Sequence, residues 1–163
     1  MTESTTEGEK KGFVIADKYR KLFAEHLELY RTDPERAHIW DATVVGATGP
    51  VTTMMLDTVG RRSGEVRQVT IQYFRDGDRY LIVASQGGMP QDPFWYLNLL
   101  ETPECHIQVG AFGAKARATV AEGAERERLW EKVSNEQENY KRYQARSPRQ
   151  IPVVILDVIA PDA

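Results

Sequence analysis

The chain has 163 residues, of which 41% are apolar and 28% charged, so its composition predicts a single soluble globular domain. Its formal net charge of −3 provides no strong basic field, which argues against nucleic acid as a partner. The single cysteine, Cys105, excludes an internal disulfide; with no visible secretory signal and no apolar run of about 18 residues, we expect a cytoplasmic protein.

The N-terminal segment is predicted to be a disordered tail over residues 1–12, followed by one domain over 13–163. From Phe13 to about Tyr30, apolar residues recur three or four apart and predict an amphipathic helix that Asp33-Pro34 ends. Its shared face holds Ile15, Tyr19, Leu22, Phe23 and His26. We favour docking of this face on the core; peripheral membrane association is the alternative, because Lys18, Arg20 and Lys21 flank it.

Three strands are predicted next. Val51–Val59 is rich in Val, Thr and Met, and Val66–Phe74 alternates apolar and polar residues. Gly60–Glu65 lies between them and predicts a hairpin. Asp76-Gly77 predicts a second turn, which leads into the strand Tyr80–Ser85.

A short glycine loop and a helix follow the third strand. Asp92 suits the helix N-cap and Pro93 suits the first helical position. The helix ends at Thr102-Pro103, and we expect it to be buried, because apolar residues surround it: Phe94, Trp95, Leu97, Leu99 and Leu100.

The last third predicts a hairpin, a helix and a final strand. Cys105–Val109 and Lys115–Val120 pair around Gly110–Gly113, and a charged helix over Glu125–Val133 is extended by Tyr140–Gln144. Ile151–Ile159 has apolar residues at odd and at even positions, which point to opposite faces of a strand, so both of its faces should be buried. The fold class is α+β: an antiparallel barrel of about six strands with flanking helices, without the βαβ alternation of a Rossmann domain.

The turn Gly60–Gly64 combines features of an anion site. Its glycines allow backbone N–H groups to converge, as in an anion-binding nest. Arg61 and Arg62 add forked donors suited to phosphate, Ser63 adds a hydroxyl, and Arg67 can reach the same anion. The spacing alone fits a solvated basic hairpin equally well.

Two further features are candidates for ligand binding. The loop Ser85-Gln86-Gly87-Gly88 precedes a helix, so it permits close backbone approach and favours negative charge. Trp95 and Tyr96 can wall a flat ring with Asn98 as a hydrogen-bond anchor, or simply fill core. Tyr140 and Tyr143 share a helical face, which is either a packing face or a pocket wall with phenolic donors.

Other chemistry has little support. His26, His38 and His106 lie on different elements, and no HExxH or CxxC spacing predicts a metal site. We expect His106 to be exposed or hydrogen bonded. No serine lies in a GxSxG turn, and Cys105 is expected to be a buried structural residue.

Several motifs together resemble the deazaflavin (coenzyme F420)-dependent nitroreductase family of actinobacteria, a family of F420-dependent oxidoreductases. The resemblance covers about Val51 to Ile159. Its motifs are, in chain order, Asp57–Arg67, Ser85–Gly88, Pro93–Leu99, Tyr140–Gln144 and Ile151–Leu156.

The resemblance implies an FMN-binding-like split barrel that binds coenzyme F420, a deazaflavin with a phosphate and an oligoglutamate tail. It implies that Arg61, Arg62, Ser63, Gly64 and Arg67 hold the phosphate and tail. The cofactor would be surrounded by Ser85, Gln86, Gly87, Gly88, Trp95, Tyr96 and Asn98, with Thr70 and Ile71 beside its ring. Tyr140 and Tyr143 would face an electron acceptor: a quinone, an enone, a coumarin-like lactone or, in some members, a nitroimidazole.

Hydride transfer to such an acceptor places negative charge on an oxygen. Donors aimed at that oxygen stabilise the transition state, and Tyr143, Tyr140 and Ser85 are the candidates. The nitroimidazole-active pattern has Lys at position 86 and Tyr at position 137, where this chain has Gln86 and Gln137, so nitroimidazole reduction is less expected. The alternatives are an FMN-dependent oxidoreductase on the same barrel and a non-catalytic carrier of a cofactor or lipid-like ligand. The sequence leaves the oligomeric state open.

Overall fold

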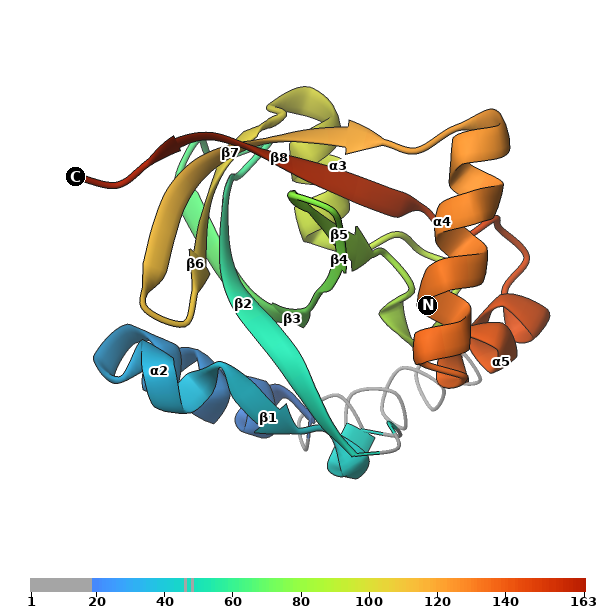
Figure 1. Cartoon of the computed structure of the whole chain (residues 1–163), viewed down its shortest axis with the longest axis horizontal. Helices are drawn as coiled ribbons and strands as arrows, with labels where there is room; N and C mark the ends of the chain where they lie inside the picture. The colour runs from blue at the N-terminus through green and yellow to red at the C-terminus, as the bar shows by residue number, and fades with distance from the viewer. Residues whose placement is uncertain (1–18, 46, 48) are drawn as a thin grey trace, which may run out of the picture.

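The computed structural model describes residues 19–45, 47 and 49–163, so the predicted tail and the first helical residues lie outside the described part. Antiparallel strands curl into a small barrel, with α4 and α5 at one end and the N-terminal helical segment across the bottom in Figure 1. The predicted α+β class and antiparallel barrel are confirmed. None of the described helices is long and apolar enough to cross a membrane.

The barrel closes through one bent strand. Its strands are β1 Ile39–Asp41, β2 Pro50–Val59, β3 Val66–Gln72, β4 Phe74–Asp76, β5 Arg79–Val83, β6 Glu104–Val109, β7 Phe112–Val120 and β8 Val153–Pro161. β3 pairs with β2 and β4 pairs with β5, so the predicted strand Val66–Phe74 bends at Tyr73 and joins both ends of the sheet. The prediction of about six strands therefore holds for the barrel, while the short β1 was not predicted.

The barrel is split along β3. Among the described residues β3 pairs with β2 alone, whereas β2, β6, β7, β8 and β5 follow one another in the sheet. The second edge of β3 thus has no strand partner there, and unpaired backbone groups at such an edge can bind a ligand.

Two cores lie on opposite faces of β5 and β8. Ile82 and Leu156 belong to the cluster inside the barrel, whereas Leu81 and Ile155 belong to a second cluster with Leu129 of α4. Because side chains alternate along a strand, apolar residues at both parities mean that both faces are covered. The two-sided burial predicted for the last strand is confirmed for Val153–Leu156 and is lost at the exposed Asp157.

The helices follow the predicted order with two corrections. They are α2 Pro34–Ala37, α3 Phe94–Glu101, α4 Gly123–Glu136 and α5 Asn139–Arg146, with 3-10 turns η1 Thr43–Val45 and η2 Gln86–Gly88. α5 does not extend α4, because Gln137 is extended (φ −139°, ψ 98°) and ends α4. α3 is not buried all round: it packs on the barrel on one side, and Phe94 and Leu100 are 76% and 52% exposed.

The predicted cap of α3 is also wrong. Pro93 occupies the N-cap position and supplies no side-chain hydrogen bond. Asp92 lies one residue earlier, and its Oδ1 atom is 3.0 Å from Nη1 of Arg149. The ion pair with a distant arginine therefore replaces the local capping bond that the sequence suggested.

The N-terminal helical segment, 19–32, docks on the barrel as expected. His26 is buried, its ring stacks on Trp40 with centroids 4.8 Å apart, and its Nε2 lies 2.9 Å from the carbonyl oxygen of Ala37. Tyr30 donates its hydroxyl hydrogen to the carbonyl oxygen of Thr53 (2.5 Å). The helix is thus attached to the start of β2 by buried polar contacts.

Acidification should loosen this attachment through His26. Burial lowers its pKa below the ordinary 6.5, so the folded protein keeps the ring neutral. The unfolded chain takes up a proton first as pH falls, so the free energy of unfolding decreases below about pH 6.5. We expect the melting temperature to fall more steeply between pH 7.5 and 5.5 in the native protein than in a His26→Gln variant. Equal slopes would contradict this; His106→Gln, at an exposed site, is the control.

Candidate functional site

The β2–β3 turn presents arginines at the rim of the barrel. Gly60 N–H donates to Glu65 O and Gly64 N–H donates to Gly60 O, both at 2.8 Å, and Gly64 needs its left-handed φ of 72° to do so. These bonds close the hairpin, so the predicted nest is incomplete because its glycine N–H groups are used internally. The guanidinium groups of Arg61 and Arg62 are what the turn offers to an anion.

Asn98 fixes this turn on α3. Its side chain is 3% exposed; Oδ1 accepts a hydrogen bond from Arg61 N–H and Nδ2 donates to Thr58 Oγ1, both at 3.1 Å. The Arg61 guanidinium also lies over the Phe94 ring, 5.6 Å from its centroid. The structure therefore gives Asn98 protein partners for both of its amide groups and makes it a positioning residue for the arginine turn.

The glycine loop packs on α5 through its backbone. Gln86, Gly87 and Gly88 have left-handed φ values of 43°, 64° and 81°. A Cβ on Gly88 would lie 2.7 Å from the carbonyl oxygen of Tyr143, closer than side chains tolerate. The loop is thus in direct contact with the helical turn that carries Tyr143, and Ser85, 9% exposed, starts that loop.

The two predicted site tyrosines have different environments. Tyr140 is 6% exposed, belongs to the second core cluster and makes one long hydrogen bond, 3.5 Å from its hydroxyl to Gln72 Oε1. Burial raises its pKa. Tyr143 is only partly buried, and its hydroxyl oxygen accepts a 3.2 Å hydrogen bond from Asn139 Nδ2. Tyr143 therefore has the more accessible hydroxyl of the two, and Tyr140 is a core residue.

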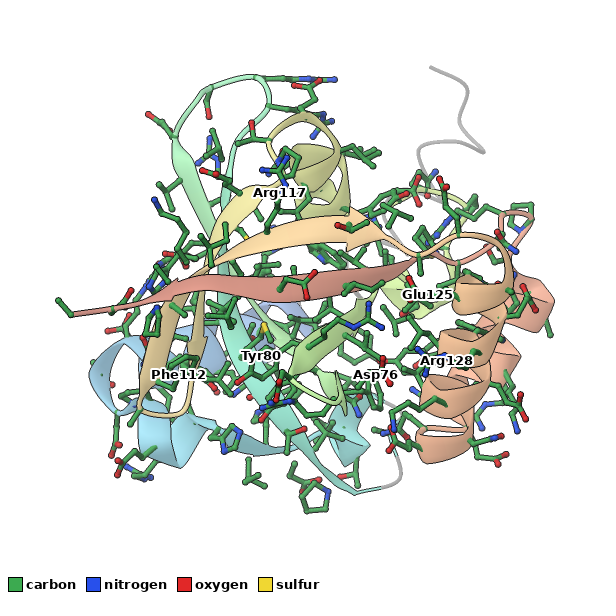
Figure 2. The ribbon with its side chains drawn as sticks, turned by 45° about the horizontal axis from the view of Figure 1, so that its top comes forward. Asp76, Tyr80, Phe112, Arg117, Glu125 and Arg128 are labelled. Atoms are coloured by element: carbon green, nitrogen blue, oxygen red, sulfur yellow. The ribbon has the colours of Figure 1, made fainter. Side chains whose placement is uncertain are left out.

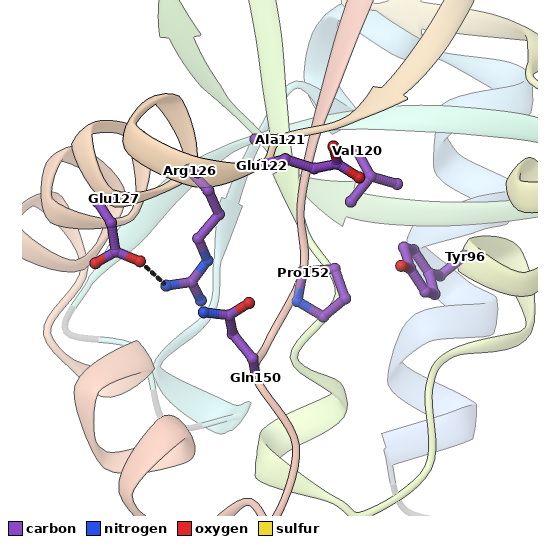
Figure 3. Close-up of a pocket in the computed structure, with 9 residues that line it drawn as sticks. Tyr96, Val120, Ala121, Glu122, Arg126, Glu127, Gln150 and Pro152 are labelled. Carbon is purple, nitrogen blue, oxygen red and sulfur yellow. Dashed lines mark hydrogen bonds and ion pairs between the residues drawn. The ribbon is translucent and has the colours of Figure 1, made fainter.

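The two aromatic residues predicted to form one wall, Trp95 and Tyr96, lie in different surroundings. Trp95 is 9% exposed and belongs to the core inside the barrel. Tyr96 lies on the opposite side of α3 from Phe94 and Asn98, and lines a separate pocket of about 440 Å³ with Arg126 and Gln150 (Figure 3). On β3, Ile71 packs against the barrel core and Thr70 points to the other face.

A second hollow lies next to Tyr140. It has a volume of about 700 Å³ and includes Gln72, Tyr73, Phe74 and Gln137 in its lining. Gln72 joins this hollow to Tyr140 by the hydrogen bond described above. The volume is within the range of small-molecule sites.

The remaining predicted groups have structural partners. Cys105 is buried, which raises the pKa of its thiol to about 12, so its prediction as a structural residue is confirmed. His106 Nε2 lies 2.8 Å from Asp162 Oδ2, as a hydrogen-bonded surface histidine would. Within the described ranges, no three His, Cys, Asp or Glu side chains gather as metal ligands would.

Sequence reasoning missed two residues that organise the site. Arg149 contacts the glycine loop 60 residues or more away, through Ser85 O and Met89 O. Gln144 donates to Arg149 O and accepts from Ile151 N–H, both at 2.8 Å. No local sequence pattern around Arg149 or Gln144 predicts contacts with residues so distant in the chain. The one available signal was that Gln144 directly follows Tyr143.

The site is therefore one connected set of elements. α3 contacts the arginine turn through Phe94 and Asn98, the glycine loop leads into α3, and the same loop lies on α5 beside Tyr143. The turn and the start of β3 carry three positive charges, on Arg61, Arg62 and Arg67, and one negative charge, on Glu65. Glu65 pairs with Arg67 at 3.4 Å. This donor set fits an anionic, phosphate-bearing ligand.

Comparison with known proteins shows which family the chain resembles. The family model for F420H(2)-dependent quinone reductases matches residues 29–158. An F420H(2)-dependent quinone reductase of Mycobacterium tuberculosis (strain H37Rv) is 41% identical over 111 residues, which cover 66% of this chain and 74% of that protein. A solved F420-H2-dependent reductase superposes with a TM-score of 0.60 at 33% identity, covering 64% of this chain and 93% of that one. A structure described as a domain-swapped dimer has a TM-score of 0.62 at 27% identity, covering 91% and 99%.

Proposed function

Because this chain belongs to the F420H(2)-dependent quinone reductase family, we propose that it reduces an electron-poor acceptor with reduced coenzyme F420. The acceptors that we propose are quinones, enones and coumarin-like lactones, with nitroaromatics as a less favoured class. The observation that carries the proposal is the connection of the arginine turn, the glycine loop and Tyr143 through α3 and α5.

The residues present fit the cofactor. Arg61, Arg62 and Arg67 would hold its phosphate and acidic tail, because guanidinium groups form charge-assisted hydrogen bonds with such groups. The absence of a side chain at Gly87 and Gly88 would permit close backbone approach. When bound, reduced coenzyme F420 supplies the hydride, and the chain supplies binding, orientation and electrostatics.

Tyr143 and Ser85 would act on the acceptor. A carbonyl or quinone oxygen that gains negative charge is stabilised by a donor already oriented toward it. Asn139 orients the Tyr143 hydroxyl by donating to its oxygen, which leaves the phenolic hydrogen available for the acceptor. Tyr143 or a water would then provide the proton. Tyr140, whose hydroxyl donates to Gln72, would pack behind Tyr143 as part of the pocket wall.

The hollow beside Tyr140 is the proposed acceptor site. Its volume of about 700 Å³ suffices for a bicyclic quinone or a coumarin ring. Gln72 and Gln137 provide amide groups to its lining. The aromatic Tyr73 and Phe74 and three charged residues, Arg75, Lys132 and Glu136, also line it. The proposal requires no membrane contact by residues 19–32, since the buried side of that helix already contacts the barrel.

A panel assay tests the proposal. Purified protein would receive reduced F420 with a menaquinone, a coumarin-type lactone or a nitroimidazole, and cofactor oxidation would be followed by its absorbance. We expect turnover with the quinone or the lactone that exceeds turnover with the nitroimidazole. A tryptophan-quenching titration would compare F420 with FMN: tighter binding of FMN would favour the flavin alternative, and F420 binding without any turnover would favour a carrier.

Removal of one phenolic hydroxyl should separate the two tyrosines. We expect Tyr143→Phe to lower kcat by about 10-fold to 100-fold, because one positioned donor is lost from the transition state. Tyr140→Phe should change kcat by less than about threefold, because its hydroxyl makes only one long hydrogen bond. Steady-state kinetics at saturating reduced cofactor would measure both. An equal loss in the two variants would contradict the assignment of Tyr143.

A further inference from the structure

The glycine loop holds one residue in a backbone conformation that its side chain disfavours. Three successive residues are left-handed, and the first of them, Gln86 with φ 43°, is not a glycine. A non-glycine residue is disfavoured in this region and persists there only where its surroundings determine it. Inside the loop, Gly88 N–H donates to Ser85 O at 2.9 Å and Met89 N–H donates to Gln86 O at 3.2 Å.

Arg149 contacts the loop at three points from outside. Its Nη2 donates to Ser85 O at 2.9 Å, its Nε donates to Met89 O at 3.2 Å, and its Nη1 lies 3.0 Å from Asp92 Oδ1. The side chain is 15% exposed; its bond to the Ser85 carbonyl oxygen is partly buried, and its bond to the Met89 carbonyl oxygen lies at the surface. One planar guanidinium thus connects the first residue of the loop with Met89 and Asp92, which follow the loop before α3, and a lysine ammonium cannot reproduce this geometry.

Arg149 is itself fixed to the helix that carries Tyr143. The Gln144 side-chain amide donates to Arg149 O and accepts from Ile151 N–H, both at 2.8 Å. The loop touches the same helix through the close approach of Gly88 to the Tyr143 carbonyl oxygen. The loop and α5 are therefore held together twice: by direct contact and by Arg149.

We propose that Arg149 is a positioning residue that holds the glycine loop against α5, beside Tyr143. Through this position of the loop it would affect both cofactor binding and turnover. The inference rests on the proposed function for its catalytic consequence. Its structural part, the fixing of the loop by one guanidinium, stands independently and can be measured without cofactor.

The test compares Arg149→Lys and Arg149→Ala with the control Arg79→Lys, which alters a part-buried arginine paired with Asp76 at the far end of β5. Asp92→Asn is a graded variant, because it weakens the ion pair with Arg149 and keeps both carbonyl bonds. Cofactor affinity is read by tryptophan quenching with oxidised F420, and loop mobility by hydrogen exchange of residues 86–89 in the cofactor-free protein. We expect Arg149→Lys to weaken affinity by about tenfold and to accelerate exchange in the loop, because charge-assisted bonds are lost. The control Arg79→Lys should stay within about threefold of the native protein, and Asp92→Asn should lie between this control and Arg149→Lys.

Chemical rescue distinguishes positioning from general stability. Methylguanidinium at millimolar concentration should restore cofactor affinity to Arg149→Ala, whereas methylammonium at the same concentration should not. Affinity and loop exchange in Arg149→Lys equal to those of the native protein would overturn the proposal, as would equal rescue by the two cations. If the native protein binds no deazaflavin, the proposed function fails, and the exchange measurement still decides whether Arg149 fixes the loop. Should Arg149→Ala not fold, Arg149→Lys and its exchange data carry the decision.

Discussion

Replacing both Arg61 and Arg62 with alanine is expected to raise the dissociation constant for oxidised coenzyme F420 by about two orders of magnitude. Each guanidinium would form a charge-assisted hydrogen bond with the phosphate or acidic tail, at about 1.5 kcal/mol apiece. The turn itself should persist, because its hairpin bonds and its attachment to Asn98 use backbone groups of the turn, which alanine retains. Tryptophan quenching would measure the affinity, with the melting temperature as a check on folding.

Loss of charge alone must be separated from loss of the site. A Lys115→Ala/Arg128→Ala variant removes the same net charge from β7 and α4; Arg128 pairs there with Asp76, as Figure 2 shows. We expect this control to change the dissociation constant by less than about threefold, because neither residue belongs to the β2–β3 turn and salt screens interactions between exposed charges. Equal losses in the two double variants would show that the arginine turn is not the anion site.

Local patterns predicted the fold and the parts of the site that are local in sequence. Alternation in Val66–Phe74 placed Ile71 and Tyr73 toward the barrel core, and the glycines at positions 60–64 placed the turn. Turn chemistry and side-chain period act over a few residues, so a single sequence contains them. The bend at Tyr73, which makes one predicted strand into β3 and β4, depends on closure of the whole sheet and has no local signal.

Residues whose roles depend on distant contacts were assigned less well. Asp92 has the chemistry of an N-cap, but Arg149 is 57 positions further along the chain and takes its carboxylate in an ion pair. Asn98 is a predicted cofactor contact, and the structure shows that its amide also pairs with the backbone of Arg61 and the hydroxyl of Thr58. A buried amide must be paired, and only the folded structure shows whether its partner is ligand or protein.

Gly88 offers the sharpest test of how the loop and Tyr143 are joined. An alanine there would place its Cβ 2.7 Å from the Tyr143 carbonyl oxygen and 3.0 Å from its Cα, both backbone atoms of a packed helix, at a φ of 81°. We expect Gly88→Ala to lower the free energy of unfolding by about 3 kcal/mol, from overpacking together with left-handed strain. Because the loop must shift away from α5, kcat with a quinone acceptor should also fall by at least about tenfold.

Gly87→Ala is the matched control, since the two glycines are adjacent and both left-handed. Gly87 has φ 64°, but an added Cβ would meet no protein atom within 4 Å, so strain of about 1 kcal/mol is the only expected loss in its free energy of unfolding. Urea unfolding would give the two free energies, and turnover assays the two kcat values. If both alanines cost the same, the close approach of Gly88 to Tyr143 would carry no energetic weight. A large loss confined to Gly88→Ala would instead show that direct backbone contact with α5 holds the loop in place beside Tyr143.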